Sequence, residues 1–191
     1  MQDFLFYLKL GWEHIISLDA LDHQLFVIAL IVMYSFRDFK KLFILVTAFT
    51  IGHSVTLALS VLDLFRISSD WVEFLIPLTI VITALDHILM SNKSKNLIKV
   101  NYGLALVFGL IHGMGFANTA RMMLAKEQSI AIPLLGFNIG LELGQILVVL
   151  LFLMISYIAT TLFRVPKRDW VLFISSCVFA LSAQMVLERI P

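Results

Sequence analysis

Long apolar runs separated by short charged segments dominate the pattern of this chain. Each run is long enough for the roughly 20 residues that a helix needs to cross a bilayer. The apolar residues come in blocks and do not alternate with polar ones, which argues against the strands of a membrane β-barrel. The pattern predicts an all-α, polytopic membrane bundle of about six transmembrane helices in a single integral membrane domain, residues 1–191. The predicted spans are 20–36, 42–64, 71–90, 100–123, 133–163 and 170–187.

The first predicted span is preceded by a segment, DFLFYLKLGWEHII, that mixes apolar and aromatic side chains with Lys9 and Glu13. One interpretation is a short N-terminal helix in the membrane interface, with Tyr7 and Trp12 at the level of the lipid headgroups. The other is an extension of the first span. The pattern favours neither.

Composition agrees with the membrane assignment and excludes other classes. Hydrophobic residues make up 60% of the chain and charged residues 14%, whereas about a quarter of a soluble domain is charged. The net charge of +1, without a basic patch that contains aromatics, predicts no nucleic-acid partner. Cys177 is the single cysteine, which excludes an internal disulfide and a thiolate metal cluster.

Charge in the loops predicts an orientation. Nine of the 14 lysines and arginines follow spans one, three and five, and loops rich in these residues face the cytoplasm. We therefore expect a multi-pass protein of the cell's inner (plasma) membrane, with both termini outside the cytoplasm. The nine residues are Arg37, Lys40, Lys41, Lys93, Lys95, Lys99, Arg164, Lys167 and Arg168.

Ionisable side chains in membrane spans are candidates for function, because each costs about 2.5–3.5 kcal/mol to insert. In the second span, His53 shares a polar stripe with Thr50 and Ser54, three and one residues away. In the fourth span, His112 lies among several glycines, which indicates a close approach of neighbouring backbones.

The third and fifth spans carry further polar groups. Asp86 and His87 are adjacent near the cytoplasmic end of the third span. In the fifth span, Asn138, Glu142 and Gln145 stand at positions i, i+4 and i+7 and share one helix face.

Asp19, Asp22 and His23 stand where the first span begins, at its predicted outer mouth. On a continuous helix their spacing would place them on one face. There, Asp22 and His23 could replace part of the hydration shell of an arriving cation, since a carboxylate beside a histidine orients the ring and raises its basicity. The alternative is that Asp19 caps the helix and Asp22 only pairs with His23.

All five histidines lie in or at the ends of spans. Imidazole nitrogens and carboxylate oxygens suit divalent ions such as nickel, cobalt or zinc. The chain is therefore predicted to bind a divalent metal ion, as a substrate or as a resident ion. The competing interpretation is a structural network in which polar side chains join the helices.

Four segments together resemble the HupE/UreJ family of membrane proteins, which is associated with nickel permeases. These segments are GWEHIISLDALDHQLF, FTIGHSVTLAL, FGLIHGMGFA and FNIGLELGQ. The chain lacks the paired histidine-glycine and histidine-glycine-x-glutamate segments of the better-characterised branch, so it resembles the less studied second branch of the family. The resemblance implies a secondary metal-ion permease of six or seven helices that needs no nucleotide-binding partner.

The resemblance also implies site residues. The first-helix motif maps onto His14, Asp22 and His23, although seven residues separate His14 from Asp22 and the better-characterised permeases have four or five. Whether His14 reaches the same ion is left open by this spacing. The predicted metal-binding residues are Asp22, His23, His53, His112, Glu142, His14, Asp86 and His87, with Thr50, Ser54, Asn138 and Gln145 as supporting polar residues.

Three functions compete at this stage. The leading one is a secondary permease for nickel, cobalt or zinc, with the lipid bilayer and the metal ion as partners and with small-residue ladders that also suit a homo-oligomer. The alternative is an intramembrane zinc-dependent hydrolase of a lipid amide or ester, in which His53, His112 and Asp22 hold zinc and Glu142 is the base. The third is an accessory protein without a metal.

Overall fold

The computed structural model describes residues 2–64, 67–89, 97–124 and 130–191, and all regular secondary structure in these ranges is helical. The all-α prediction is confirmed. The helices are α1 (Gln2–Ile16), α2 (Leu21–Ile31), α3 (Phe39–Val61), α4 (Ser69–Leu89), α5 (Leu97–Gly115), α6 (Ala117–Leu124), α7 (Ala131–Tyr157) and α8 (Lys167–Glu188), with short turns η1 (Leu18–Ala20), η2 (Phe36–Asp38) and the π-helical η3 (Ile158–Leu162).

Most of these helices are long and apolar enough to cross a membrane. Four segments pass this criterion alone, and the bent pair of α1 and α2 is a fifth. With the shorter apolar helix Tyr102–Gly115, they agree with a bundle of about six membrane helices. The four segments are Phe36–Val61, Ser69–Leu89, Ala131–Leu162 and Lys167–Glu188.

The first span is a broken helix. Between α1 and α2 the chain forms the 3-10 turn η1 and bends by 63°. With 11 residues, α2 is about 16 Å long, roughly half of the hydrocarbon core. The predicted span 20–36 thus corresponds to the second half of a segment that begins in α1. Of the two interpretations of the N-terminal segment, the structure favours the continuation, because Tyr7 is buried and α1 packs along α7.

Glycines allow two helix pairs to pack with their backbones in contact. Gly136 of α7 lies against Phe4 of α1, and Gly140 lies against Leu8, so α1 and α7 run in the same direction. A Cβ atom on Gly140 would overlap the carbonyl oxygen of Leu8. The close approach predicted from the glycines of the fourth span is confirmed as well, because Gly113 of α5 lies against the backbone of His53 in α3. These contacts fix the end of α1 and the middle of α3.

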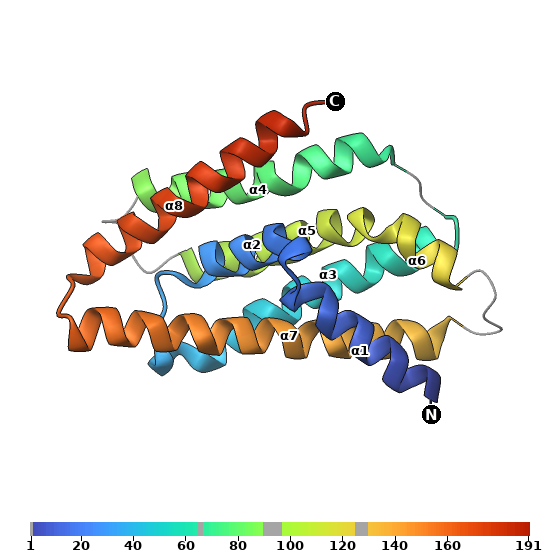
Figure 1. Cartoon of the computed structure of the whole chain (residues 1–191), viewed down its shortest axis with the longest axis horizontal. Helices are drawn as coiled ribbons and strands as arrows, with labels where there is room; N and C mark the ends of the chain where they lie inside the picture. Colours follow the sequence, from blue (N-terminus) through green and yellow to red (C-terminus); the bar gives the residue numbers. More distant parts are fainter. Residues whose placement is uncertain (1, 65–66, 90–96, 125–129) are drawn as a thin grey trace.

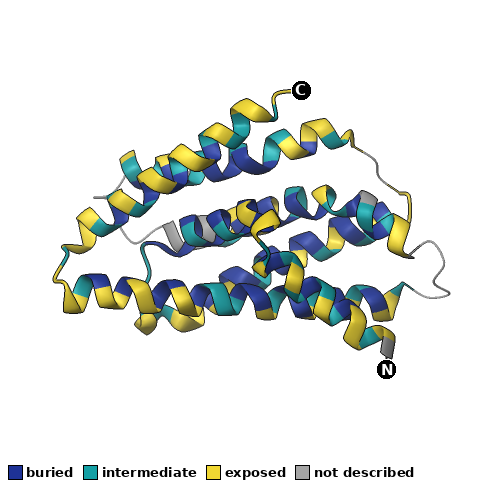
Figure 2. Cartoon of the chain, in the orientation of Figure 1, coloured by how far each residue is buried: buried dark blue, intermediate teal, exposed yellow. Residues whose placement is uncertain are grey.

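The core surrounds α2. Figure 1 shows α4 and α8 along one side of the bundle, α7 and α1 along the other, and α2 and α5 between them, while α3 runs obliquely from α7 towards α6. Buried positions lie mainly on the inward faces of the helices, while exposed positions line the outside (Figure 2). Many of the exposed side chains are large and apolar, such as Ile51, Leu143 and Phe173, as expected for a surface that faces lipid. Figure 1 also shows that α1 starts and α8 ends toward the same end of the bundle.

Candidate metal centre

The break between α1 and α2 brings two histidines together. His14 belongs to the last turn of α1 and His23 to the first turn of α2. Because the chain bends between them, their ring centroids lie 4.8 Å apart. His14 therefore lies beside His23, although seven residues separate it from Asp22.

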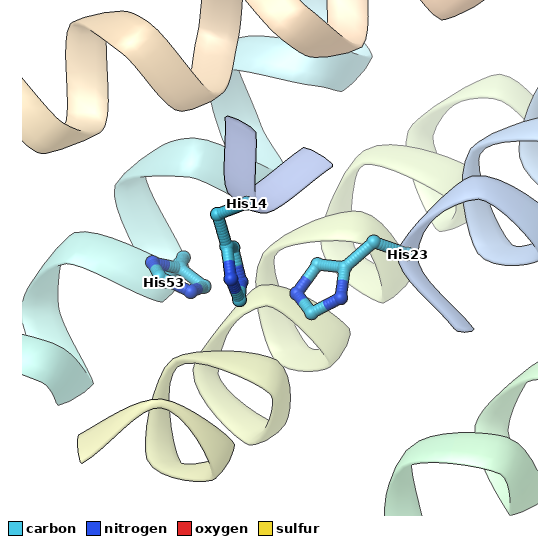
Figure 3. Close-up of side chains that lie close together, drawn as sticks. All are labelled: His14, His23 and His53. Atoms are coloured by element: carbon cyan, nitrogen blue, oxygen red, sulfur yellow. The ribbon is translucent and has the colours of Figure 1, made fainter. Parts of the chain in front are cut away.

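A third histidine comes from α3. Figure 3 shows the rings of His14, His23 and His53 side by side within the bundle. One nitrogen of each ring lies within 4.8 Å of the other two. A transition metal holds imidazole nitrogens about 2.0–2.1 Å away, so small ring rotations would bring all three onto one ion. We call these three residues the histidine triad.

Four of the six ring nitrogens of the triad have no hydrogen-bond partner among the described residues. The Nε2 atoms of His14 and His23 and both ring nitrogens of His53 are buried without a hydrogen bond to any residue that the structure describes. A buried polar group without a partner costs about 1–3 kcal/mol. A bound metal ion would satisfy these nitrogens.

Asp22 acts on the triad through His23. Its Oδ1 atom lies 2.9 Å from Nδ1 of His23 and also accepts the backbone N–H of His23 at 2.8 Å. The carboxylate therefore holds the ring proton on Nδ1 and leaves the lone pair on Nε2, the nitrogen that is free for a metal. Asp22 is predicted from the sequence as a direct ligand, and in the structure its Oδ1 atom contacts His23.

His112 of α5 borders the triad. Its ring centroid is 4.9 Å from that of His23, and its two buried nitrogens have no hydrogen-bond partner among the described residues. It does not belong to the set whose ligand atoms are all within 4.8 Å of one another. His112 can therefore receive an ion from the triad or complete its coordination after a small movement.

A pocket of about 300 Å³ is lined by His14, His23 and His112, and His53 is not among its lining residues. Arg189, at the end of α8, reaches into it and pairs with Asp22, with Nη1 3.4 Å from Oδ2. Asp19 also lines the pocket but makes no capping hydrogen bond, so the predicted cap is wrong. The ionisable residues that line the pocket are His14, Asp19, Asp22, His23, Glu73, His112 and Arg189.

Gln24 stabilises the helix break. Its side-chain amide donates to the carbonyl oxygens of Ile15 at 2.9 Å and Ser17 at 3.0 Å. The end of α1 leaves such carbonyls without helical partners, and within a membrane they need a protein donor. Gln24 and Arg189 were not predicted from the sequence as residues of the site. A polar Gln24 directly after His23 inside an apolar span was the available signal.

The polar residues of the fifth span join α7 to α3. Thr47 donates to Glu142 at 2.6 Å, and Thr50 donates to the Oε1 atom of Gln145 at 3.1 Å. Glu142 does not line the pocket of the triad. The carboxylate of Glu142, the predicted base of a hydrolase, is hydrogen-bonded to Thr47 of α3 instead.

Four other predicted residues lie outside the triad. Ser54 and Asn138 each donate to a carbonyl oxygen of their own helix, four residues earlier. His87 is buried in α4, and the neighbouring Asp86 is half-buried. None of these four side chains lines the pocket of the triad.

Comparison with known proteins identifies the family of this chain. A family model described as HupE / UreJ protein matches residues 1–189, nearly the whole chain. No curated protein and no solved structure matches. The matched range includes all the histidines in and around the triad.

Proposed function

We propose, starting from the fact that this chain belongs to the HupE/UreJ family, that it is a secondary permease for a divalent transition-metal ion. The family is associated with nickel and cobalt uptake, and we place these two ions before zinc. The observation that carries the proposal is the convergence of His14, His23 and His53 at a break in a membrane helix. Imidazole nitrogens favour such ions over magnesium or calcium.

A broken helix is suited to this task. Secondary transporters often build their substrate sites from discontinuous helices, whose irregular backbone lines a cavity inside the membrane. Here Ser17 and Asp19, within the break, line the pocket that leads to the triad. Its volume of about 300 Å³ corresponds to about ten waters at roughly 30 Å³ each. A hydrated ion can therefore enter before it exchanges water for imidazoles.

Charge in the site favours release as well as binding. Three neutral imidazoles leave the two charges of the ion uncompensated, and Asp22 supplies one negative charge through His23. The pairing of Arg189 with Asp22 offsets that charge. A permeation site needs ligands that bind an ion without trapping it, and this balance provides such a site. We assign Glu142, Asp86 and His87 to the later part of the path.

The membrane potential would drive uptake. It contributes about 2.3 kcal/mol per charge per 100 mV, so an inward dication gains about twice that. We place both termini outside the cytoplasm because the opposite end of the bundle carries the basic residues. The pocket of the triad would then open to the outside, near Glu73 at the start of α4 and Arg189 at the end of α8. Of the predicted basic residues, Lys93 and Lys95 lie outside the described residues.

Uptake by proteoliposomes tests the proposal. Purified protein in vesicles should accumulate nickel or cobalt above protein-free vesicles, and an inside-negative potential should increase the initial rate several-fold, since the transported charge is two. Zinc serves as the comparison ion. Stoichiometric, tightly held zinc with cleavage of lipid and no uptake would instead identify the hydrolase. If the protein neither accumulated nor bound a metal ion, the result would favour an accessory protein.

Arg189 offers a second test. Replacing Arg189 by glutamine should tighten metal binding about fivefold, because removal of a partly exposed opposing charge is worth about 1 kcal/mol. In an Asp22→Asn background the same change should have little effect, since the two residues form one pair. Isothermal titration with cobalt measures both. Weaker binding after Arg189→Gln would show that Arg189 holds Asp22 in place and does not compete with the ion.

A further inference from the structure

A second cavity lies at the other end of the bundle and has no part in the proposed permease. It measures about 370 Å³ and is enclosed by the segment after α2, the end of α7 and η3, and the start of α8. We propose that this cavity binds the phosphate headgroup of an anionic membrane lipid. The residues used in the argument are Phe36, Arg37, Ser156, Tyr157, Lys167 and Trp170.

Two uncompensated positive charges line the cavity. Arg37 comes from η2 and Lys167 begins α8, and neither forms an ion pair within the part of the chain that the structure describes. By contrast, the nearby Lys41 is paired with Asp38 at 2.7 Å. A guanidinium presents a planar pair of donors that matches phosphate oxygens, and an ammonium adds a mobile charge. An anion with phosphate chemistry therefore complements the cavity.

Aromatic side chains place the cavity at the depth of lipid headgroups. Trp170 and Tyr157 both line it, and these residue types gather at the membrane–water interface. The indole N–H of Trp170 donates to the hydroxyl of Ser156 at 2.9 Å, which holds the ring in place. This end of the bundle is also the basic end.

An apolar surface next to the charges favours a lipid over a soluble anion. Phe36 is 47% exposed, and its ring centroid lies 6.3 Å from that of Tyr157, which is 57% exposed. A free phosphate would leave both rings uncovered, whereas the acyl chains of a lipid would cover them while its phosphate meets Arg37 and Lys167. Basic pockets between membrane helices bind lipid headgroups in this way.

Fluorescence of Trp170 tests the proposal without reference to metal transport. In a Trp12→Phe, Trp71→Phe protein, Trp170 is the only tryptophan left of three. The protein is placed in phosphatidylcholine nanodiscs that contain brominated phosphatidylglycerol or, separately, brominated phosphatidylcholine, since bromine quenches tryptophan on contact. We expect the anionic lipid to quench at a mole fraction about 25-fold lower than the neutral one, about fivefold for each of the two cations.

Charge variants show whether the preference comes from this cavity. Arg37→Gln and Lys167→Gln should each reduce the preference about fivefold, and together they should abolish it. Both side chains are exposed, so the variants should fold, which gel filtration checks. Lys40→Gln is the matched control, because Lys40 is an exposed cation of the same region that does not line the cavity.

Three results would overturn the proposal. One is equal quenching by the two brominated lipids. Another is a preference that survives the double Arg37→Gln, Lys167→Gln change, or that Lys40→Gln removes equally. The third is loss of the preference when inorganic phosphate or glycerol phosphate is added at millimolar concentration, because the cavity would then take a soluble anion. None of these results depends on whether the triad carries a metal.

Discussion

Replacing His53 by alanine should weaken the binding of nickel or cobalt at least about a hundredfold. The change removes one of three imidazoles whose nitrogens lie within 4.8 Å of one another. Loss of a residue that only orients a metal ligand already costs about 10- to 100-fold in affinity, so loss of a ligand should cost more. Titration of the purified protein with cobalt, followed by its visible absorption, measures the effect.

His87→Ala is the matched control for this experiment. His87 is also a buried histidine of the bundle, but it lies on α4 outside the triad. The His87→Ala protein should bind cobalt with an affinity within about threefold of the parent's, because changes at distant, independent sites act separately. Equal losses in the two variants would indicate a general structural effect, and unchanged affinity in His53→Ala would exclude the triad as the binding site.

Replacing Gly140 by valine should disrupt both the fold and the site. Any Cβ atom at this position overlaps the carbonyl oxygen of Leu8, which is backbone and cannot rotate away. Helix α1 must then move off α7, at a cost of at least about 2 kcal/mol. Since α1 carries His14, we expect a lower unfolding midpoint in detergent and a loss of metal binding together.

Gly103→Val separates this effect from helix propensity. Gly103 is also a helical glycine, but it is exposed, and a Cβ atom there would have no neighbour within 4 Å. The Gly103→Val protein should have a free energy of unfolding within about 1 kcal/mol of the parent's. It should bind metal with the parent's affinity. If Gly140→Val unfolded at the same temperature as Gly103→Val, the contact between α1 and α7 would not support the site.

The sequence was sufficient for the helical bundle but not for the break in its first span. Apolar blocks predict membrane helices because the bilayer demands about 20 apolar residues in succession. The break at 17–20 contains neither glycine nor proline, so the usual signals of a helix end are missing. The break depends on Gln24, whose side-chain amide donates hydrogen bonds to the carbonyl oxygens of Ile15 and Ser17. A bond of this kind forms only once the chain has folded back.

The candidate metal site, too, could be predicted only in part, because local spacing does not show which residues meet after the chain bends. Helical spacing places Asp19, Asp22 and His23 on one face of a continuous helix, but the bend makes His14 the neighbour of His23 instead. Spacing also shows correctly that Glu142 and Gln145 share a face. It does not identify what that face meets, which is Thr47 and Thr50 of α3.

Arg189 illustrates what charge counting cannot show. In the sequence it is one basic residue near the C-terminus, and its distance from Asp22 is 167 residues along the chain. Only the packing of α8 beside α2 and α4 brings its guanidinium into the pocket. A long-range pair between single charges has no local pattern, so contacts of this kind must come from a structure.

X-ray absorption of the nickel-loaded protein in lipid nanodiscs tests the central claim most directly. The claim is that three histidines from α1, α2 and α3 bind one ion at the helix break. We expect multiple scattering from about three imidazoles, with their nitrogens about 2.0–2.1 Å from nickel. In a His14→Ala protein loaded at a higher nickel concentration, the number of imidazoles should fall by one. A shell of oxygen ligands alone, or the same number of imidazoles in both proteins, would contradict the account.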